Sequence, residues 1–335
     1  MKRILCFVLM ALLLASMSTV AAGQQLEKVN FLLNWTIAAD HAPYYVGLKK
    51  GWYAEAGLDL NIIIGKGSGF STTSIDQEMA DIAIADAPVV FKFRNDGAQA
   101  KIIGIIFDAH PNGMFFWNDS GIKEPKDIAG KTVAVPATDG HKVMWPAFAA
   151  MIGVDPNSVE FVNIEPTAKV SALASRNADV VFELLTGIPN FEAAIPQGGF
   201  SWFHWAEYGF NSYAHSYITN DKTIAERPEM LRKFLDVTYR AWEWTLNNPE
   251  EAIQILSEYQ PINTADLTKS LMIEMAFLKT PRYKEHGMGY IDPAQVQATY
   301  DLVDTYQVDL TFPVEDIYTA EFLPETPYNN FELAK

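Results

Sequence analysis

The sequence predicts an α/β fold made of two units, in each of which strands alternate with helices. Short apolar runs, typical of buried strands, alternate with helical segments from residue 29 to residue 106 and again after residue 131. A polar stretch containing Pro and Gly, SGIKEPKDIAGK at 120–131, connects the two series. The 335 residues are enough for two domains of ordinary size.

Residues 1–22 predict a cleavable secretory signal. Lys2 and Arg3 precede an apolar run at 4–14, and small residues end at Ala22. The run is shorter than the roughly 20 residues of a membrane-spanning helix, so cleavage is favoured over a membrane anchor. Cys6 lies in this segment, and the mature chain of 313 residues (335 less 22) has no cysteine for disulfides or thiol chemistry. We therefore expect a periplasmic protein stabilised by a sizeable core.

The first series begins with a strand at 29–33 and a helix that Asp40 can cap, with Pro43 in its first turn. The next strands are expected at 58–64, 82–85 and 101–106, with helices at 71–79 and from Pro88 to about 95. The loop GKGSGFS at 65–71 is glycine-rich, but it matches neither GxxxxGK[ST] nor GxGxxG. It can hold a small polar group or an anion at a helix N-terminus, or it is a plain turn.

The second series predicts strands at 132–135, 160–164 and 179–183, with helices at 141–152 and 167–175. Segment 229–247 is strongly helical, and its apolar stripe, which includes Trp242, reads as core. The region 250–330 is expected to be mostly helical, and Pro293 begins one of its helices.

Charge and motifs exclude several functions. The formal net charge is −16, and loss of Lys2 and Arg3 makes the mature chain −18, which argues against nucleic acid and anionic membranes as partners. The six histidines show no HExxH or paired ligand spacing, so we expect no metal. There is no GxSxG and no marked acid–base pair, so we expect no catalytic residues, no cofactor and no enzyme activity.

Polar and aromatic residues gather where predicted strands lead into helices. Asn34, Trp35, Asp40, His41 and Tyr44 follow the first strand, and Asp86 follows the third. The loop 65–71 follows the second strand, and PATDGHKVMW at 136–145 follows the strand at 132–135. Ligands of open α/β sheets bind at this edge of the sheet, so these loops predict a binding cleft.

Four segments carry a resemblance to a known family. The segments LNWTIAADHAPYYVGLKKGWYAEAGLDL (33–60), GKGSGFSTTSIDQEMADIAIADAP (65–88), KEPKDIAGKTVAVP (123–136) and WAEYGFNSYAHSYITND (205–221) resemble the periplasmic substrate-binding proteins of the nitrate/sulfonate/taurine and thiamine-precursor type. The resemblance implies a two-lobed type II periplasmic-binding-protein fold with two hinge crossings. Lobe one would hold 23–113 plus 216–335, and lobe two would hold 114–215. It also implies a monomer that traps a small molecule by closure and delivers it to an ABC permease and ATPase.

The residues near the expected cleft favour a flat heteroaromatic ligand. The six arginines of the mature chain lie outside the cleft motifs, so a strong anion has no guanidinium partner; only Lys66 and Lys142 come near. Carboxylates can accept N–H bonds from a ring whose faces stack on aromatic side chains. The candidate ligand-binding residues are Trp35, His41, Tyr44, Ser68, Phe70, Ser71, Asp86, Trp145, Glu165, Glu183 and Tyr208.

We therefore predict a binder of a thiamine-precursor aminopyrimidine. Two alternatives stay open: the same fold serving an alkanesulfonate, taurine, nitrate or an aromatic acid, and a pyrimidine-synthesis-type enzyme, which the missing cysteine disfavours. Each candidate residue also has a structural alternative, as a core, capping or salt-bridge group. Residues 36–39, TIAA, depart from the family's usual pattern after the Trp, which leaves the ligand itself open.

Overall fold

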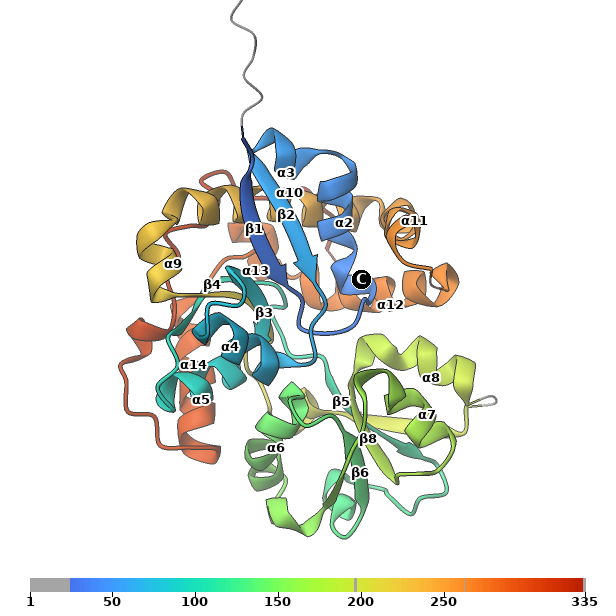
Figure 1. Cartoon of the computed structure of the whole chain (residues 1–335). Helices are drawn as coiled ribbons and strands as arrows, with labels where there is room; N and C mark the ends of the chain where they lie inside the picture. Colours follow the sequence, from blue (N-terminus) through green and yellow to red (C-terminus); the bar gives the residue numbers. More distant parts are fainter. Residues whose placement is uncertain (1–24, 196–197, 262, 334–335) are drawn as a thin grey trace, which may run out of the picture.

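Two five-stranded sheets, each flanked by helices, form two lobes in the computed structural model, which describes residues 25–195, 198–261 and 263–333 (Figure 1). The first sheet has the order β2 (Leu58–Ile63), β1 (Glu27–Leu32), β3 (Ile82–Asp86), β10 (His215–Asn220) and β4 (Ala100–Ile105). The second has the order β7 (Glu160–Asn163), β6 (Thr132–Val135), β8 (Val180–Leu184), β5 (Asn112–Trp117) and β9 (Phe200–His204). We call these sheets with their helices the first and the second lobe.

Each sheet is mixed in the same way. Strands β1, β2 and β3 pair in parallel, as do β6, β7 and β8. Strand β10 lies antiparallel to β3 and β4, and β5 lies antiparallel to β8 and β9. The chain crosses to the second sheet between β4 and β5 and returns between β9 and β10, which confirms the predicted two-lobed α/β fold with two crossings. The lobe limits at 113 and 215 stay a prediction; β5 and β10 begin at Asn112 and His215.

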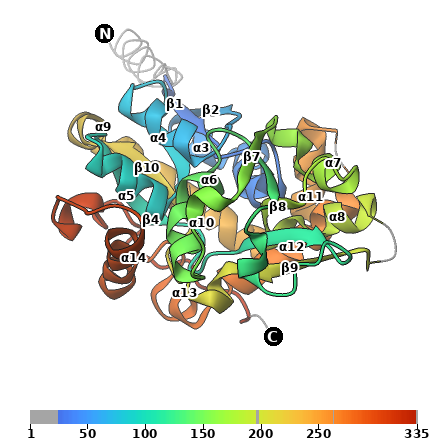
Figure 2. The same cartoon turned by 90° about the horizontal axis from the view of Figure 1, so that it is seen from below.

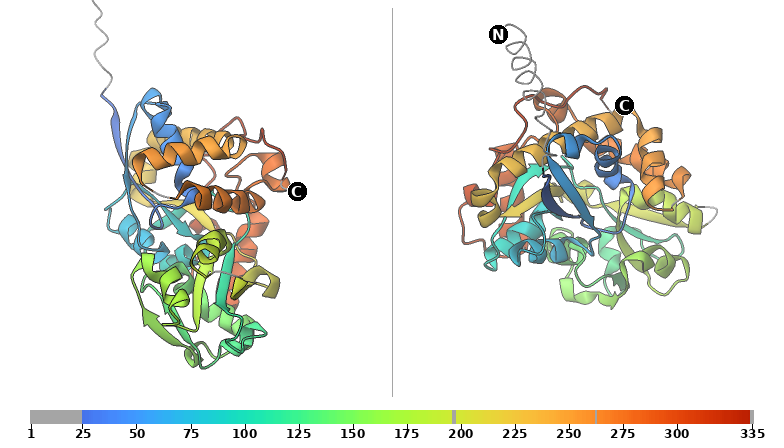
Figure 3. Two further views of the ribbon diagram at one scale, coloured as in Figure 1. Left: turned by 90° about the vertical axis from the view of Figure 1, so that its right-hand side faces the viewer. Right: turned by 45° about the horizontal axis from the view of Figure 1, so that its top comes forward.

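The helices are distributed over both lobes and the junction between them (Figure 3). They are α2 (Ala42–Lys49), α3 (Trp52–Glu55), α4 (Ser68–Asp76), α5 (Ala87–Asn95), α6 (Gly140–Met151), α7 (Lys169–Ala174), α8 (Ile188–Ala194), α9 (Asp221–Glu226), α10 (Pro228–Asn247), α11 (Pro249–Tyr259), α12 (Thr264–Leu278), α13 (Pro281–His286) and α14 (Pro293–Tyr306). Two short 3-10 turns matter for the site, η1 (Ala39–His41) and η5 (Leu185–Gly187). Helix α14 packs against α5 of the first lobe and α6 of the second (Figure 2).

The core of the first lobe forms between its sheet and α10. The predicted apolar stripe of α10 is buried, and Trp242 donates from Nε1 to the Tyr217 hydroxyl at 2.8 Å. This confirms that Trp242 belongs to the core. No helix among the described residues is long and apolar enough to cross a membrane. The predicted secretory signal at 1–22 lies outside the described residues.

Two local predictions near the site need correction. The N-cap of α2 is His41, and Asp40 lies inside η1, so Asp40 does not cap that helix. Helix α4 begins at Ser68, three residues before the predicted start. Gly67 makes this earlier start possible because its φ of 117° lies in a region that favours glycine. A Cβ at Gly67 would also lie 2.3 Å from the carbonyl oxygen of Thr138, so the two lobes meet at this position.

Candidate functional site

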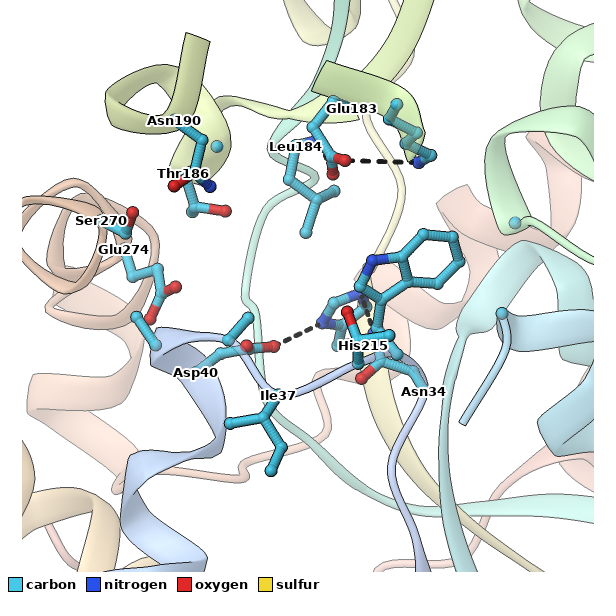
Figure 4. Close-up of a pocket in the computed structure, with 18 of the residues that line it drawn as sticks. Asn34, Ile37, Asp40, Glu183, Leu184, Thr186, Asn190, His215, Ser270 and Glu274 are labelled. Carbon is cyan, nitrogen blue, oxygen red and sulfur yellow. Dashed lines mark hydrogen bonds and ion pairs between the residues drawn. The ribbon is translucent and has the colours of Figure 1, made fainter. Parts of the chain in front are cut away.

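A cavity of about 300 Å³ lies between the lobes, at the carboxyl ends of the parallel strands (Figure 4). Its volume is at the small end of the range for ligand pockets, on the order of 300–1,000 Å³. The first lobe contributes 34–40, Gly67, Ser68, Asp86 and His215, and the second contributes 139–141, Lys169, 183–184, 186–187 and Asn190. Helix α12 and its N-cap Asn263 close a third side, to which the helix contributes Asp266, Leu267, Ser270 and Glu274. The cavity therefore occupies the place that the strand-end rule predicts.

Four of the eleven predicted ligand residues line this cavity: Trp35, Ser68, Asp86 and Glu183. Ser68 begins α4 and donates from Oγ to Asp86 Oδ2 at 2.8 Å, and the Asp86 backbone N–H donates to Ser68 Oγ at 3.1 Å. Glu183 accepts from the Leu184 backbone N–H at 2.8 Å through Oε1. The structure thus brings these four together at one cavity, and their contact with a ligand stays a prediction.

Two predicted residues, Tyr44 of α2 and His41 of η1, lie behind the cavity wall. Tyr44 is fully buried, its hydroxyl is 2.9 Å from that of Tyr217, and its ring packs edge-on against Phe31 at 4.7 Å. His41 is also fully buried, and its Nδ1 accepts from the Ala38 backbone N–H at 3.0 Å. Both side chains have structural partners in this position.

The other five predicted residues also lie outside the lining. Ser71 is buried, and Phe70 is half-buried against the core. Trp145 stacks on Phe182, with 5.3 Å between the ring centroids. Trp145 also donates from Nε1 to the Pro156 carbonyl oxygen at 2.9 Å. Glu165 and Tyr208 are exposed. Neither Lys66 nor Lys142 belongs to the lining; Lys66 is exposed and Lys142 lies 5.3 Å from the Phe161 ring centroid.

His215 lies between two carboxylates of the first lobe. Its Nδ1 is 3.6 Å from Asp40 Oδ2, and its Nε2 is 3.5 Å from Asp86 Oδ1. Burial opposes a charge on His215, but Asp86 and Asp40 outweigh burial and raise its pKa. His110 also lies 3.5 Å from Asp86, yet burial lowers its pKa to about 3. Of these two histidines, His215 is therefore the one that gains a proton more readily.

A chain of hydrogen bonds sets the neutral tautomer of His215. Because His41 Nδ1 accepts from the Ala38 N–H, its Nε2 carries the proton and donates to Asn34 Oδ1 at 3.1 Å. The Asn34 amide then donates from Nδ2 to His215 Nε2 at 3.0 Å. The remaining proton of His215 lies on Nδ1, facing Asp40. Protonation of His215 Nε2 would break its bond from Asn34, so this chain responds to pH.

Lys169 forms a second charged group with residues of the second lobe. Its Nζ is 2.6 Å from Asp139 Oδ2 and 3.5 Å from Glu183 Oε2, and the side chain is nearly fully buried. Burial opposes its charge, but Asp139 and Glu183 outweigh burial and raise its pKa, so the ammonium stays protonated. His141 Nδ1 lies 2.8 Å from Asp139 Oδ1. Burial opposes the charge of Asp139, but Lys169 and His141 keep its pKa well below the ordinary value.

Helix α12 presents two polar atoms without partners to the cavity. Glu274 Oε2 and Ser270 Oγ find no hydrogen-bond partner among the described residues, and both residues are buried. Burial and the nearby charge of Asp40 raise the pKa of Glu274 well above its ordinary value. Glu274 Oε2 and Ser270 Oγ are therefore available to form hydrogen bonds with a ligand in the cavity.

Sequence reasoning missed Lys169, His215, Asp139 and Glu274 as site residues. Asp139 lies in the segment 136–145 after β6, and Lys169 follows β7. Both therefore come after the end of a parallel strand, where ligand-binding residues of such sheets are expected. Glu274 lies near the end of a helix and carries no such signal. Within the ranges that the structure covers, no cluster of three or more His, Cys, Asp or Glu side chains is arranged to hold a metal ion.

Comparison with known proteins identifies both a family and a fold. Residues 38–252 match the family model described as NMT1/THI5 like. A 4-amino-5-hydroxymethyl-2-methylpyrimidine phosphate synthase of Legionella pneumophila is 24% identical over 317 residues, which cover 91% of this chain and 95% of that protein. The formylaminopyrimidine-binding protein of Halalkalibacterium halodurans is 25% identical over 259 residues, which cover 76% of this chain and 78% of that protein.

Solved structures share the fold at low sequence identity. A Candida albicans protein described as exhibiting the generic periplasmic binding protein structural fold has a TM-score of 0.69 and 13% identity, covering 90% of this chain and 99% of that one. The alkanesulfonate-binding protein of Xanthomonas axonopodis pv. citri, bound to MOPS, has a TM-score of 0.68 and 10% identity, covering 88% and 98%. These likenesses confirm the predicted periplasmic-binding-protein fold.

Proposed function

Because the chain belongs to the NMT1/THI5-like family, we propose that it is the solute-binding protein of an ABC importer and captures a small heteroaromatic solute, such as a thiamine-precursor aminopyrimidine, between its lobes. The formylaminopyrimidine-binding relative supports this solute class. The single observation that carries the proposal is the charge of the cavity wall.

The wall is rich in carboxylates and poor in cations. Among the described lining residues, Lys169 is the one Lys or Arg, and two carboxylates already neutralise its charge. The carboxyl groups of the lining belong to Asp40, Asp86, Asp139, Glu183, Asp266 and Glu274. A sulfonate or nitrate would need donors with free positive charge, which Arg forks usually supply. A ligand rich in N–H donors fits this wall better than an anion.

Trp35 supplies a flat surface at the same cavity. Its indole ring lies beneath Lys169, whose Nζ is 4.5 Å from the ring centroid. The cation–π attraction between the Lys169 ammonium and the ring helps to hold the Trp35 indole in this orientation. An aromatic solute can stack on the indole while its ring N–H groups reach the carboxylates.

The relatives named as synthases raise enzyme activity as the second class. We propose binding without turnover, because the buried lysine of this cavity is poorly placed to react. A nucleophilic lysine needs a lowered pKa and a free electron pair. Asp139 and Glu183 instead raise the pKa of Lys169 and hold it protonated.

A ligand panel tests the solute class. The mature chain, residues 23–335, is unfolded to strip ligand, refolded, and heated with 4-amino-5-hydroxymethyl-2-methylpyrimidine, thiamine, riboflavin, taurine, MOPS or nitrate. A solute at a hundred times its Kd stabilises the fold by about 2.7 kcal/mol. We expect the aminopyrimidine to raise the midpoint, and we expect mass spectrometry to recover it unchanged. A shift with anions alone would overturn the solute class, and recovery of a converted product would overturn binding without turnover.

Two tryptophan variants make the assay specific for the cavity. Trp35→Ala removes the stacking surface and is expected to abolish the shift. Trp202→Ala removes an exposed tryptophan, 40% accessible on β9, and is expected to leave the shift intact. Equal effects of the two variants would argue against the cavity as the binding site.

We also propose a periplasmic location and delivery to an ABC permease with its ATPase. The predicted signal at 1–22 and the periplasmic-binding-protein fold support both. Fractionation of cells that express the full chain tests the location: mature protein in the periplasmic fraction is expected, and uncleaved protein in the cytoplasm would refute it.

A further inference from the structure

Helix α12 is the part of the cavity wall that joins both lobes. It packs against α11 and η1 of the first lobe and against α8 and η5 of the second. It lies beyond residues 38–252, the part of the chain that matches the family model. The family model therefore does not cover the side chains that α12 adds to the cavity.

Glu274 is the most buried ionisable residue that α12 contributes to the cavity lining. Its side chain is 2% exposed, and Oε2 has no hydrogen-bond partner among the described residues. In the close-up it points into the cavity from one side, with Asp40 beside it and Ser270 one turn earlier on the same helix (Figure 4). A buried carboxyl oxygen without a hydrogen-bond partner costs stability, so an unpaired Oε2 at the cavity points to a ligand that supplies the partner.

The groups around Glu274 favour its neutral form. Asp40 on η1 faces it and carries negative charge, because its partners His41 and His215 outweigh the effect of burial and lower its pKa. Burial and that charge raise the pKa of Glu274, and they outweigh the hydrogen bond from the Asp40 backbone, which favours the ionised form. On its own helix the nearest polar neighbours in the lining are Ser270 and Asp266, and neither brings positive charge. In its neutral form the Glu274 side chain has one O–H donor beside one C=O acceptor.

We propose that Glu274 determines the specificity of this site by pairing, as a neutral carboxylic acid, with the edge of a heteroaromatic ring that carries an exocyclic amine beside a ring nitrogen. The acid donates its O–H to the ring nitrogen and accepts an N–H from the amine. The inference rests on the proposed function, and it adds the contact that selects among flat solutes. Ionised carboxylates only accept, so Asp40 cannot replace this donor–acceptor pair.

The test compares two probes on three proteins by titration calorimetry. The probes are 4-amino-5-hydroxymethyl-2-methylpyrimidine and 5-hydroxymethyl-2-methylpyrimidine, which lacks the amine. Wild type is expected to bind the aminated probe at least about tenfold more tightly, because a site built to bond an N–H rejects the analogue without it. Glu274→Gln keeps a donor beside an acceptor and is expected to keep this ratio within about threefold. Glu274→Leu is expected to bind both probes equally.

Each outcome separates the inference from the proposed function. If wild type binds neither probe, the proposed solute class fails. If wild type binds and Glu274→Leu keeps the full ratio, only the role of Glu274 fails. If Glu274→Gln loses the ratio as completely as Glu274→Leu, the neutral form is refuted and a charged carboxylate acts instead.

Two controls exclude an indirect effect. Glu274→Leu removes a buried carboxyl whose Oε2 is unpaired, so its ligand-free form is expected to keep an unfolding midpoint close to that of wild type. Met272→Gln changes a residue of the same helix that is 55% exposed and is expected to keep the wild-type ratio. A loss of the ratio in Met272→Gln would show that any change in α12 disturbs the site and would overturn the assignment to Glu274.

Discussion

Lys169 of the second lobe lies over the indole ring of Trp35 of the first, with Nζ 4.5 Å from the ring centroid. The same ammonium group is 2.6 Å from Asp139 and 3.5 Å from Glu183. One buried cation therefore joins a stacking surface on one lobe to two carboxylates on the other. Its pairing also explains why the Lys169 ammonium does not make the cavity an anion site.

Lys169→Met is expected to lower the free energy of unfolding by about 3–5 kcal/mol, because removal of one partner leaves a buried charge uncompensated. Urea denaturation followed by circular dichroism measures this loss. The matched control is Lys222→Met, which breaks an exposed pair with Glu78 at 2.6 Å and should lower the free energy of unfolding far less, because solvent screens an exposed ion pair. Similar losses of unfolding free energy in the two variants would refute the claim that the buried Lys169 ion pairs stabilise the fold.

His215 predicts a pH dependence of stability. Asp86 and Asp40 outweigh burial and raise its pKa above the ordinary value of 6.5, so the charged ring favours the folded state. Its contribution is fully present below pH 6.5 and is lost as the pH rises through the higher pKa of the folded state. His215→Gln is expected to flatten the fall in unfolding free energy over that window.

Urea titrations from pH 5 to pH 9 measure this slope. His286→Gln changes a half-exposed histidine at the end of α13 and should keep the wild-type slope. An unchanged slope in His215→Gln would show that His215 does not titrate between its two carboxylates.

Gly140 predicts a requirement for close approach of the lobes. A Cβ there would lie 2.2 Å from Asp86 Oδ2 and 3.2 Å from Ser68 Oγ, across the junction. Gly140→Ala is expected to hold the lobes apart and to weaken binding of the aminopyrimidine by about tenfold or more, because a site misplaced by about 1 Å loses its contacts. Calorimetry measures the affinity, and small-angle scattering measures the radius of gyration.

The control for Gly140→Ala is Ala150→Ser, which adds an atom at an exposed position of the same helix. It should leave affinity and radius unchanged. Wild-type affinity in Gly140→Ala would mean that the junction relaxes locally and that this glycine does not govern closure.

A variant of Tyr44 distinguishes a structural role of this residue from a role in ligand binding. Its hydroxyl lies 2.9 Å from that of Tyr217 in the core, behind the cavity wall. Tyr44→Phe is expected to lower the free energy of unfolding by about 0.5–1.5 kcal/mol, the usual net contribution of a hydrogen bond, and to leave affinity unchanged. Parallel denaturation and calorimetry check both values. Weaker binding without a loss of stability would restore the predicted ligand contact of Tyr44.

Prediction from sequence succeeded where local pattern decides. The strand β6 was predicted at its observed bounds, residues 132–135, since a short apolar run between polar turns reads as a buried strand. Strand β10, HSYITN, went unpredicted because its polar residues break the apolar pattern, although all six residues are buried. That burial comes from neighbours on both sides, β3 and β4, which are distant in the sequence.

The candidate site shows the same division. The strand-end rule found Trp35, Ser68 and Asp86 because parallel strands bring their loops to one edge. It also selected Tyr44, whose helical position turns it into the core. Glu274 was out of reach, because only the packing of α12 across both lobes brings it to the cavity.

The most direct test of the central claim is one calorimetric comparison on the ligand-stripped mature chain. 4-Amino-5-hydroxymethyl-2-methylpyrimidine and taurine are titrated separately into the protein at pH 7. The charge of the cavity wall predicts saturable 1:1 binding of the aminopyrimidine and no measurable heat from taurine. Tight binding of taurine with none of the aminopyrimidine would contradict the account and would mean that the cavity is built for an anion.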